Sequence, residues 1–370
     1  MCGICGIINY SQNNKVEEVL INNMSRQMAH RGPDEAGVYV SNSTYPAAGL
    51  GHRRLKIIDL SASAQQPMPN EQRDIWVIFN GEIYNFAQLR QELEAKGHKF
   101  RSRSDTEALV HLYEEEGEGC VKKLRGMFAF AIWDERKQTL FLARDRLGKK
   151  PLIYSYRDNK FCFASEFTAL LASGMVSKET NLDAVNYYLT FGYIPAPQTI
   201  YKNVFKLAPA HTLTLKNAEV SIKRYWDLDY SAKIKISQED AAGEVYRLLK
   251  EAVKLRLYSD VPLGAFLSGG IDSSAVVALM SELSPNRVKT FSIGFQEGDY
   301  NELHFARNIA SRFNTQHQEF IVRPQAMEIL PLLIERYGEP YADSSCIPTY
   351  YVAQQTRQQV TVALNGDGGD

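Results

Sequence analysis

The sequence predicts two domains of different fold class: an α+β domain of stacked antiparallel sheets flanked by helices, then an α/β domain with a doubly wound parallel sheet. Short β-type runs dominate the chain as far as about residue 166, whereas helices and strands alternate after about residue 238. The length of 370 residues is enough for two hydrophobic cores of ordinary size. These observations favour two successive domains.

In the first half, β-type runs outnumber helical ones. Helical spacing of apolar residues, at three and four positions, is confined to a few stretches, such as 16–29 and 86–96. The β-type runs include 75–80, 127–134, 139–145 and 161–166. This pattern predicts antiparallel sheets with helices on their outer faces.

The middle of the chain, from about residue 170 to 237, contains Pro195, Pro197 and Pro209 and a polar, hairpin-like stretch at 211–226. We interpret it as the passage between domains. The expected division is a first domain over 2–200, a connecting region over 201–237 and a second domain over 238–370.

The second half alternates helices with strands. Helices are expected at 238–257, 273–282, 302–313 and 325–337, and strands at 264–267, 289–295, 318–322 and 359–364. This order predicts a parallel sheet covered by helices on both faces, which binds ligands beyond the carboxyl ends of its strands.

The composition narrows the classes of partner. The 42 basic and 43 acidic side chains give a net charge of -1, so no bulk field attracts nucleic acid or an anionic membrane. No basic leader precedes the first apolar run, and no apolar stretch is long enough to span a membrane. We expect a cytoplasmic protein that acts on small molecules. A homodimer is compatible with the sequence.

The five cysteines fit neither a disulfide scaffold nor a Cys–His zinc site, and reduced thiols are expected. Cys2 directly follows Met1, which we expect to be removed because cysteine is small. The residue would then carry both a thiol and a free α-amine, and an amine with a pKa of about 8 can act as the base for the thiol. Taken alone, a single cysteine is more often structural or inert.

Several motifs favour a catalytic Cys2 over a structural or inert one. They follow in order as MCGICGI at the start, HRGPDEAG at 30–37, GHRRLKIIDLS at 51–61, NGEIYN at 80–85 and RSDTEAL at 103–109. Together they resemble the glutamine amidotransferase domain of the glutamine-dependent asparagine synthetase family, an N-terminal nucleophile hydrolase fold. Separate motifs in the right order are more specific than any one alone.

The resemblance implies a role for each matched residue. Arg54 would bind the α-carboxylate of glutamine, which suits a planar bidentate donor. Asn80 and Gly81 would form the oxyanion hole for the Cys2 reaction. Glu82 and Asp105 would hold the α-ammonium group of glutamine. The alternative for both acids is solvated surface charge.

A second motif, GAFLSGGIDSS at 264–274, places a loop of small residues between an expected strand and helix. Such a loop can present backbone N–H groups to phosphate, and it lacks the Walker and dinucleotide patterns. It resembles the pyrophosphate loop of enzymes that split ATP into AMP and pyrophosphate. The alternative is a plain turn.

Further matches extend the resemblance to NGDGGD at 365–370. Asp272 and Asp370 would hold Mg²⁺ against the phosphates of ATP, and Asp367 would contact the acyl adenylate. Helix capping is the ordinary alternative for Asp272 and Asp367. The residues that the resemblance assigns to ATP are Leu267, Ser268, Gly269, Gly270, Asp272, Ser273, Ser274, Ile293, Asn365 and Gly366.

The resemblance implies a glutamine-hydrolysing asparagine synthase. Ammonia released at Cys2 would pass internally to an ATP-activated carboxylate, with aspartate as the expected acceptor. Asp367 and Gly369 stand where asparagine-forming members carry Glu and Ser, and the acceptor is expected at 339–351. The alternatives are another acceptor, such as a uronic acid, and a catalytically silent regulatory protein. The family continues past this loop with helices, so the synthetase domain is expected to be incomplete at residue 370.

Overall fold

A computed structural model describes residues 1–11, 15–42, 45–294, 302–322 and 326–369. The chain forms two compact units, and each is described by itself. The first unit comprises Met1–Leu228 and Leu332–Ala342, and the second comprises Asp229–Pro331 and Asp343–Asp370.

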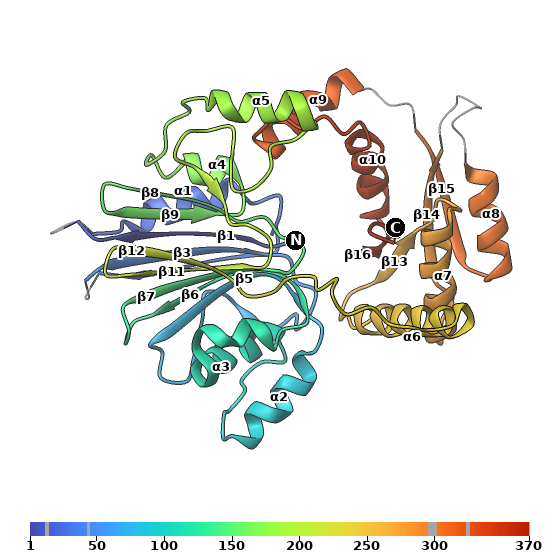
Figure 1. The fold of residues 1–370 in the computed structure, drawn as a ribbon, viewed down its shortest axis with the longest axis horizontal. Helices are drawn as coiled ribbons and strands as arrows, with labels where there is room; N and C mark the ends of the chain where they lie inside the picture. Colours follow the sequence, from blue (N-terminus) through green and yellow to red (C-terminus); the bar gives the residue numbers. More distant parts are fainter. Residues whose placement is uncertain (12–14, 43–44, 295–301, 323–325, 370) are drawn as a thin grey trace. The chain divides into compact units, whose positions relative to one another are not determined.

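Two six-stranded antiparallel sheets form the centre of the first unit (Figure 1). One sheet has the order β10-β8-β9-β1-β3-β2 and the other the order β12-β11-β7-β6-β5-β4. The strands of the first sheet are β1 (Gly3–Asn9), β2 (Glu35–Ser41), β3 (Ala47–Arg54), β8 (Ile153–Arg157), β9 (Lys160–Ala164) and β10 (Phe205–Lys206). Those of the second are β4 (Met68–Pro69), β5 (Ile75–Ile83), β6 (Gly126–Asp134), β7 (Thr139–Arg144), β11 (His211–Lys216) and β12 (Glu219–Arg224).

Helices cover the outer faces of both sheets, which gives four layers (Figure 1). α1 (Glu18–Arg26) and α4 (Phe167–Leu171) pack on the first sheet, and α2 (Phe86–Ala95) and α3 (Asp105–Glu116) pack on the second. A third core lies between the sheets and is filled by side chains such as Trp133 and Phe163. The unit also contains α5 (Leu182–Phe191) and the short 3-10 helices η1 (Ala62–Ala64) and η2 (Gly117–Lys122).

Strand register brings distant motifs to one end of the sheets. Gly3 at the start of β1 pairs with Arg53 at the end of β3, so Cys2 lies next to the motif that contains Arg54. On the second sheet, Gly81 of β5 pairs with Phe128 of β6. The end of β5 is tied to the start of α3 by a hydrogen bond from the backbone N–H of Ile83 to Asp105.

The second unit has a four-stranded parallel sheet of order β15-β14-β13-β16. Its strands are β13 (Leu263–Phe266), β14 (Lys289–Gly294), β15 (Gln316–Ile321) and β16 (Val362–Leu364). α7 (Ile271–Leu283) and α8 (Leu303–Arg312) lie on one side of the sheet and α10 (Cys346–Thr356) on the other (Figure 1). α6 (Gln238–Arg256) packs on α7, and α9 (Ala326–Tyr337) spans the division between the units.

The predicted fold classes are confirmed: stacked antiparallel sheets flanked by helices, then a parallel sheet with helices on both faces. Residues 201–224, which the sequence placed in the connecting region, supply β10, β11 and β12 to the sheets of the first unit. They do so because Leu213 and Leu215 are buried between the two sheets. The last strand was expected to begin at residue 359 but begins at Val362. Backbone hydrogen bonds extend the turn after α10 as far as Val360 and delay the strand.

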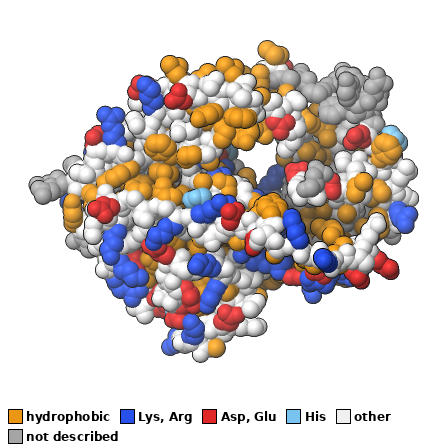
Figure 2. All heavy atoms as spheres, in the orientation of Figure 1, with side chains coloured by type: hydrophobic (Ala, Val, Ile, Leu, Met, Phe, Trp, Pro, Cys, Tyr) orange, Lys and Arg blue, Asp and Glu red, His pale blue; other side chains and the backbone are white. Residues whose placement is uncertain are grey.

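Basic and acidic side chains are interspersed on the face formed by α2 and α3, so neither sign of charge dominates there (Figure 2). This distribution agrees with the balanced net charge of -1. None of the helices in the described parts of the chain combines the length and hydropathy needed to cross a membrane.

Replacing Phe130 with alanine tests the core between the second sheet and its helices. Phe130 is fully buried and packs against Phe128 and Phe141. We expect Phe130→Ala to lower the free energy of unfolding by about 3–5 kcal/mol, because it leaves a cavity. Phe191→Ala is the matched control, since Phe191 is 56% exposed, and should change stability by less than about 0.5 kcal/mol. Equal losses in denaturant unfolding would contradict this packing.

Candidate active site

Cys2 contacts the chain through both its backbone carbonyl and its thiol. Arg31 donates a hydrogen bond from Nε to the carbonyl of Cys2 at 2.8 Å, and its guanidinium pairs with Glu166 at 2.9 Å. The Cys2 thiol lies 3.8 Å from the carbonyl oxygen of Leu55, a weak sulfur hydrogen bond. The thiol therefore has a fixed position beside the end of β3.

Burial shifts the pKa values of both groups expected to react. Burial raises the pKa of the Cys2 thiol above its ordinary value, which keeps it protonated near neutral pH. Burial also lowers the pKa of the chain's α-amine, here on Met1, to about 6. A buried thiol needs a base to become a nucleophile, and an amine in this position is unprotonated at neutral pH.

Asn80 offers an unoccupied amide in the same unit. Its side chain is 1% exposed, and neither Nδ2 nor Oδ1 has a hydrogen-bond partner among the described residues. Buried amides are normally paired, so this one is available to a bound group. The neighbouring Gly81 has no room for a side chain, because a Cβ atom would lie 2.2 Å from the carbonyl oxygen of Met127. The backbone at Gly81 thus depends on the close approach of β6.

Asp105 is a buried carboxylate at the first turn of α3. Ser104 caps this helix by accepting from the N–H of Thr106, and Asp105 accepts from the N–H of Ile83 at 2.9 Å. Burial raises the pKa of Asp105 to about 6, despite those hydrogen bonds. Glu82 is half-buried and lies two positions after Asn80 on β5. Both acids expected to hold an ammonium group are therefore connected to the end of β5, Glu82 as part of the strand and Asp105 through its hydrogen bond from Ile83.

Arg54 lies in the site, but its donors are engaged with the chain itself. Its guanidinium pairs with Glu35 at 3.1 Å and is 4% exposed. The terminal nitrogens also donate to the backbone carbonyls of Ile58, Asp59 and Ser61. A substrate carboxylate would have to replace one of these acceptors, so glutamine binding by Arg54 stays a prediction.

Two buried residues near the site were missed by sequence reasoning. His52 donates from Nε2 to the carbonyl of Phe79 at 3.1 Å, and burial lowers its pKa to about 3, so it is a neutral tie between β3 and β5. Burial also lowers the pKa of Lys150, whose charge acts on Cys2 and Glu82. Lys150 lies in the turn after β7. The carboxylate of Asp145 holds this turn by accepting hydrogen bonds from the backbone N–H groups of residues 147, 149 and 150.

In the second unit, the loop between β13 and α7 has the form expected of a phosphate loop. Gly269 adopts φ +88°, and a Cβ there would lie 2.5 Å from the side chain of Phe305, so only glycine fits. Ser268 and Ser273 bond to each other at 2.9 Å across the loop. Ser274 Oγ is buried without a partner among the described residues. The helix N-terminus thus presents free polar groups.

The second glycine loop lies against the first turn of α7. A Cβ at Gly366 would lie 2.6 Å from the backbone nitrogen of Ser273, and one at Gly369 would lie 2.4 Å from Oδ1 of Asp272. Asp367 accepts from the side chain of Asn365. No side chain caps α7, whose N-cap is Gly270, so Asp272 does not serve the capping role. Asp370 lies outside the described residues.

The other two residues that the resemblance assigned to the nucleotide flank these loops. Leu267 is buried directly after β13, and Ile293 is half-buried near the end of β14, the neighbouring strand. For Mg²⁺, Asp272 offers one hard oxygen ligand that no described residue engages in a hydrogen bond or ion pair. One carboxylate fits the ion but does not by itself complete a site.

Comparison with known proteins matches both units. The sequence model of the glutamine amidotransferase domain family matches residues 1–226, and that of asparagine synthase matches residues 244–370. The chain is 41% identical to the putative asparagine synthetase [glutamine-hydrolyzing] 2 of Methanocaldococcus jannaschii, over all of this chain and 74% of that protein. The chain belongs to the glutamine-hydrolysing asparagine synthetase family.

Other relatives in this family comparison extend beyond the chain. It is 37% identical to asparagine synthetase [glutamine-hydrolyzing] 1 of Bacillus subtilis, over 100% of this chain and 58% of that protein. It is also 35% identical to the amidase chry2 of Gibberella zeae, over 80% of this chain and 47% of that one. The chain thus spans about half to three-quarters of the relatives it matches.

Among solved structures, a glutamine phosphoribosylpyrophosphate amidotransferase from B. subtilis matches with a TM-score of 0.46 and 17% identity. The match covers 89% of this chain and 70% of the other.

The raised pKa of Asp105 predicts a pH-dependent loss of stability. Its pKa is about 6 in the fold against an ordinary value of 3.8, so the folded chain holds a proton that the unfolded chain has lost. The stability from this proton is present below about pH 4 and is lost as pH rises through 6. Relative to Asp105→Asn, the wild-type chain should gain roughly 1–3 kcal/mol between pH 7.5 and pH 4.5. Urea unfolding of both chains at each pH measures the difference, and a constant difference would contradict the assignment.

Proposed function

We propose that the protein is a glutamine-hydrolysing, ATP-dependent synthetase that releases ammonia at Cys2 and transfers it to an activated carboxylate. The observation that carries the proposal is the Asn80 amide, which is buried and lacks any partner among the described residues. In a folded chain such a group is costly unless a ligand satisfies it. The partner that we propose for this amide N–H is the tetrahedral oxyanion formed in the Cys2 reaction.

In the first half-reaction, the thiol of Cys2 attacks the carboxamide carbon of glutamine and forms a C–S bond. The thiol proton passes to the α-amine of Cys2, once Met1 has been removed. An α-amine has an ordinary pKa of about 8, so it can accept this proton near neutral pH. The side-chain amide of Asn80 and the backbone N–H of Gly81 stabilise the oxyanion. Collapse breaks the C–N bond, and the amine returns the proton to the departing ammonia.

Water then hydrolyses the thioester to glutamate and restores the thiol. Ion pairs with its α-ammonium and α-carboxylate groups hold the glutamine substrate. Glu82 and Asp105 pair with its α-ammonium, and Arg54 pairs with its α-carboxylate after giving up one of its present acceptors. Glu35 is the acceptor best suited to exchange, because it also contacts Lys56 at 3.7 Å.

In the second half-reaction, the loop over Ser268, Gly269 and Gly270 binds the phosphates of ATP with the first turn of α7. Leu267 and Ile293 frame the adenine and ribose, while Asn365 and Gly366 line the facing loop. The acceptor carboxylate attacks the α-phosphorus, and pyrophosphate leaves. Ammonia then attacks the acyl carbon, AMP leaves, and Asp367 contacts the adenylate. Mg²⁺ bound by Asp272 and Asp370 would offset the charge of the pyrophosphate.

Aspartate is the acceptor that we propose first, because relatives that match over the whole of this chain are named asparagine synthetases. A second candidate is a different carboxylate. It is favoured by Asp367 and Gly369, where asparagine-forming members carry Glu and Ser, and by relatives named as amidases. Mass spectrometry of the product formed from glutamine, ATP and each candidate acid separates the two. Asparagine as the product supports the first, and its absence beside another amide supports the second.

Replacing Asn80 with alanine tests the oxyanion hole. We expect Asn80→Ala to reduce kcat for glutamine hydrolysis by about 100- to 1,000-fold with little change in KM, because the amide acts only in the transition state. Asn85→Ala is the control, since Asn85 lies just after β5, whereas Asn80 lies within it, and its side chain binds the backbone at Lys123 and Arg125. A rise in KM without a fall in kcat would show that Asn80 binds the ground state instead.

Replacing Asp272 with asparagine tests the nucleotide loop. We expect Asp272→Asn to weaken Mg²⁺-dependent ATP binding by about tenfold or more while glutamine hydrolysis is unchanged, because one anionic ligand is lost. Asp240→Asn on α6 is the control, since the carboxylate of Asp240 accepts a hydrogen bond from Ser237, the N-cap residue of its own helix. Titration calorimetry with and without Mg²⁺ measures the change. Identical ATP affinity in both variants would remove Asp272 from the site.

A further inference from the structure

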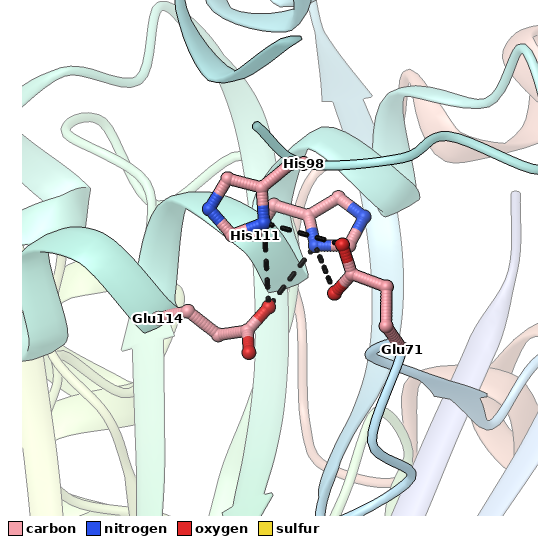
Figure 3. A group of neighbouring side chains, drawn as sticks. All are labelled: Glu71, His98, His111 and Glu114. Atoms are coloured by element: carbon pink, nitrogen blue, oxygen red, sulfur yellow. Dashed lines mark hydrogen bonds and ion pairs between the residues drawn. The ribbon is translucent and has the colours of Figure 1, made fainter. Parts of the chain in front are cut away.

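A cluster of two histidines and two glutamates lies in the first unit, apart from the residues assigned to glutamine (Figure 3). Glu71 comes from the loop between β4 and β5, His98 from the segment after α2, and His111 and Glu114 from α3. One ligand atom from each residue lies within 4.8 Å of the others. Nothing in the proposed reaction uses these four side chains.

The distances between the ligand atoms match those around a tetrahedral cation. Nδ1 of His111 is 3.0 Å from Glu114 and 3.2 Å from Glu71, while Nδ1 of His98 is 3.4 Å from Glu71 and 3.8 Å from Glu114. Zinc bonds of about 2.0–2.1 Å place neighbouring ligand atoms roughly 3.3–3.4 Å apart. These four contacts are near that spacing, although His98 and His111 approach different oxygens of Glu71. All four ligand atoms lie within 4.8 Å of one another, so binding an ion would draw the side chains inward.

Hydrogen bonds alone do not account for the arrangement. Nδ1 of His111 carries at most one proton, yet it faces carboxylate oxygens of both Glu71 and Glu114. Only the contact with Glu114 has hydrogen-bond geometry, and Oε2 of Glu71 is buried without a hydrogen bond from any described residue. A cation between the four atoms would satisfy them together.

The surrounding residues also fit a metal site. Ligating histidines usually direct their second nitrogen to a carboxylate, and ligating carboxylates are themselves hydrogen-bonded. Nε2 of His98 forms a hydrogen bond with Glu115 at 3.3 Å, whereas Nε2 of His111 lies 3.8 Å from Glu107 and has no hydrogen-bond partner among the described residues. Asn70 donates to Glu114 at 2.8 Å, and the backbone N–H of Lys99 donates to Glu71 at 3.1 Å.

The competing arrangement is a protonated His111 held by carboxylates. Burial by itself lowers the pKa of His111, but Glu107 and Glu114 outweigh it and raise the pKa to about 9. Arg136 adds a positive charge 3.9 Å from Glu114. His98 is hydrogen-bonded in the same arrangement, through Nδ1 to Glu71 at 3.4 Å and through Nε2 to Glu115 at 3.3 Å. What the arrangement leaves unexplained is Oε2 of Glu71, which is buried without a hydrogen bond from any described residue.

We propose that Glu71, His98, His111 and Glu114 bind one zinc ion or a chemically similar divalent transition cation. Four protein ligands close the coordination sphere, which is typical of a structural rather than a catalytic site. The ion would tie the β4–β5 loop and the segment after α2 to α3. Since Asp105 begins α3, the ion would hold the helix that carries one of the proposed glutamine ligands.

The test is direct metal binding by the chelator-stripped chain. We expect one equivalent of Zn²⁺ in titration calorimetry, no comparable binding of Mg²⁺, and a raised melting temperature with Zn²⁺. Co²⁺ should give the intense visible absorption of tetrahedral coordination without a thiolate charge-transfer band, which separates this site from the cysteines. His98→Gln should weaken Zn²⁺ binding by about 100-fold or more. His211→Gln should leave it unchanged, because His211 bonds to the carbonyl of Pro209 away from the cluster.

The proposal is overturned if the wild-type chain binds no stoichiometric Zn²⁺, or if Co²⁺ shows a thiolate band or octahedral absorption. It is also overturned if His98→Gln binds Zn²⁺ as tightly as the wild type. The melting temperature of the metal-free His98→Gln chain shows whether that variant is folded. If it is not, the Co²⁺ spectrum of the wild type alone decides, since it needs no variant.

Discussion

The pairing of β1 with a strand on each side is the constraint on which the proposed chemistry depends. β1 lies between β3 and β9, and all seven of its residues are buried. Ile4 adds a backbone bond to Ser165, and Arg31 bonds the carbonyl of Cys2. A chain terminus usually frays, because little holds it. Here the sheet fixes the terminus, so a nucleophile can be placed at the second residue of the chain.

Burial at this end of the sheets has opposite effects on acids and bases. It raises the pKa of the Cys2 thiol and of Asp105, and it lowers the pKa of the α-amine and of His52. Every one of these shifts disfavours the charged form. Near neutral pH the thiol, the amine and His52 are therefore mainly neutral, whereas Asp105, with a pKa of about 6, is largely ionised. The neutral thiol needs a base nearby to become a nucleophile, which is the part that the proposed mechanism gives to the α-amine.

Much of the fold could be predicted from the sequence, because alternating and periodic apolar residues mark buried strands and helices. α10 was not predicted, because the sequence analysis assigned 339–351 to acceptor binding, although Pro348 in the first turn is compatible with a helix. Site residues inside motifs were placed at the ends of the expected strands. What the sequence could not show depends on neighbours distant in the chain. The acceptors that engage Arg54 come from Glu35 and from the loop at Ile58, and Lys150 reaches the site only through its turn.

The Glu71, His98, His111 and Glu114 cluster shows the same limit. Two of its members, His111 and Glu114, are three residues apart on α3, but Glu71 and His98 are distant in the chain, and only the packing of α3 against two loops unites the four.

The central claim, that Cys2 with its own α-amine is the nucleophile, is tested most directly by covalent labelling. A glutamine analogue with a diazoketone in place of the carboxamide is incubated with the chain, and peptides are mapped by mass spectrometry. The account predicts one adduct, on Cys2 of chains that have lost Met1, and none on chains that keep Met1. Labelling of Cys346 or another cysteine instead, or equal labelling of Cys2 with Met1 retained, would contradict it.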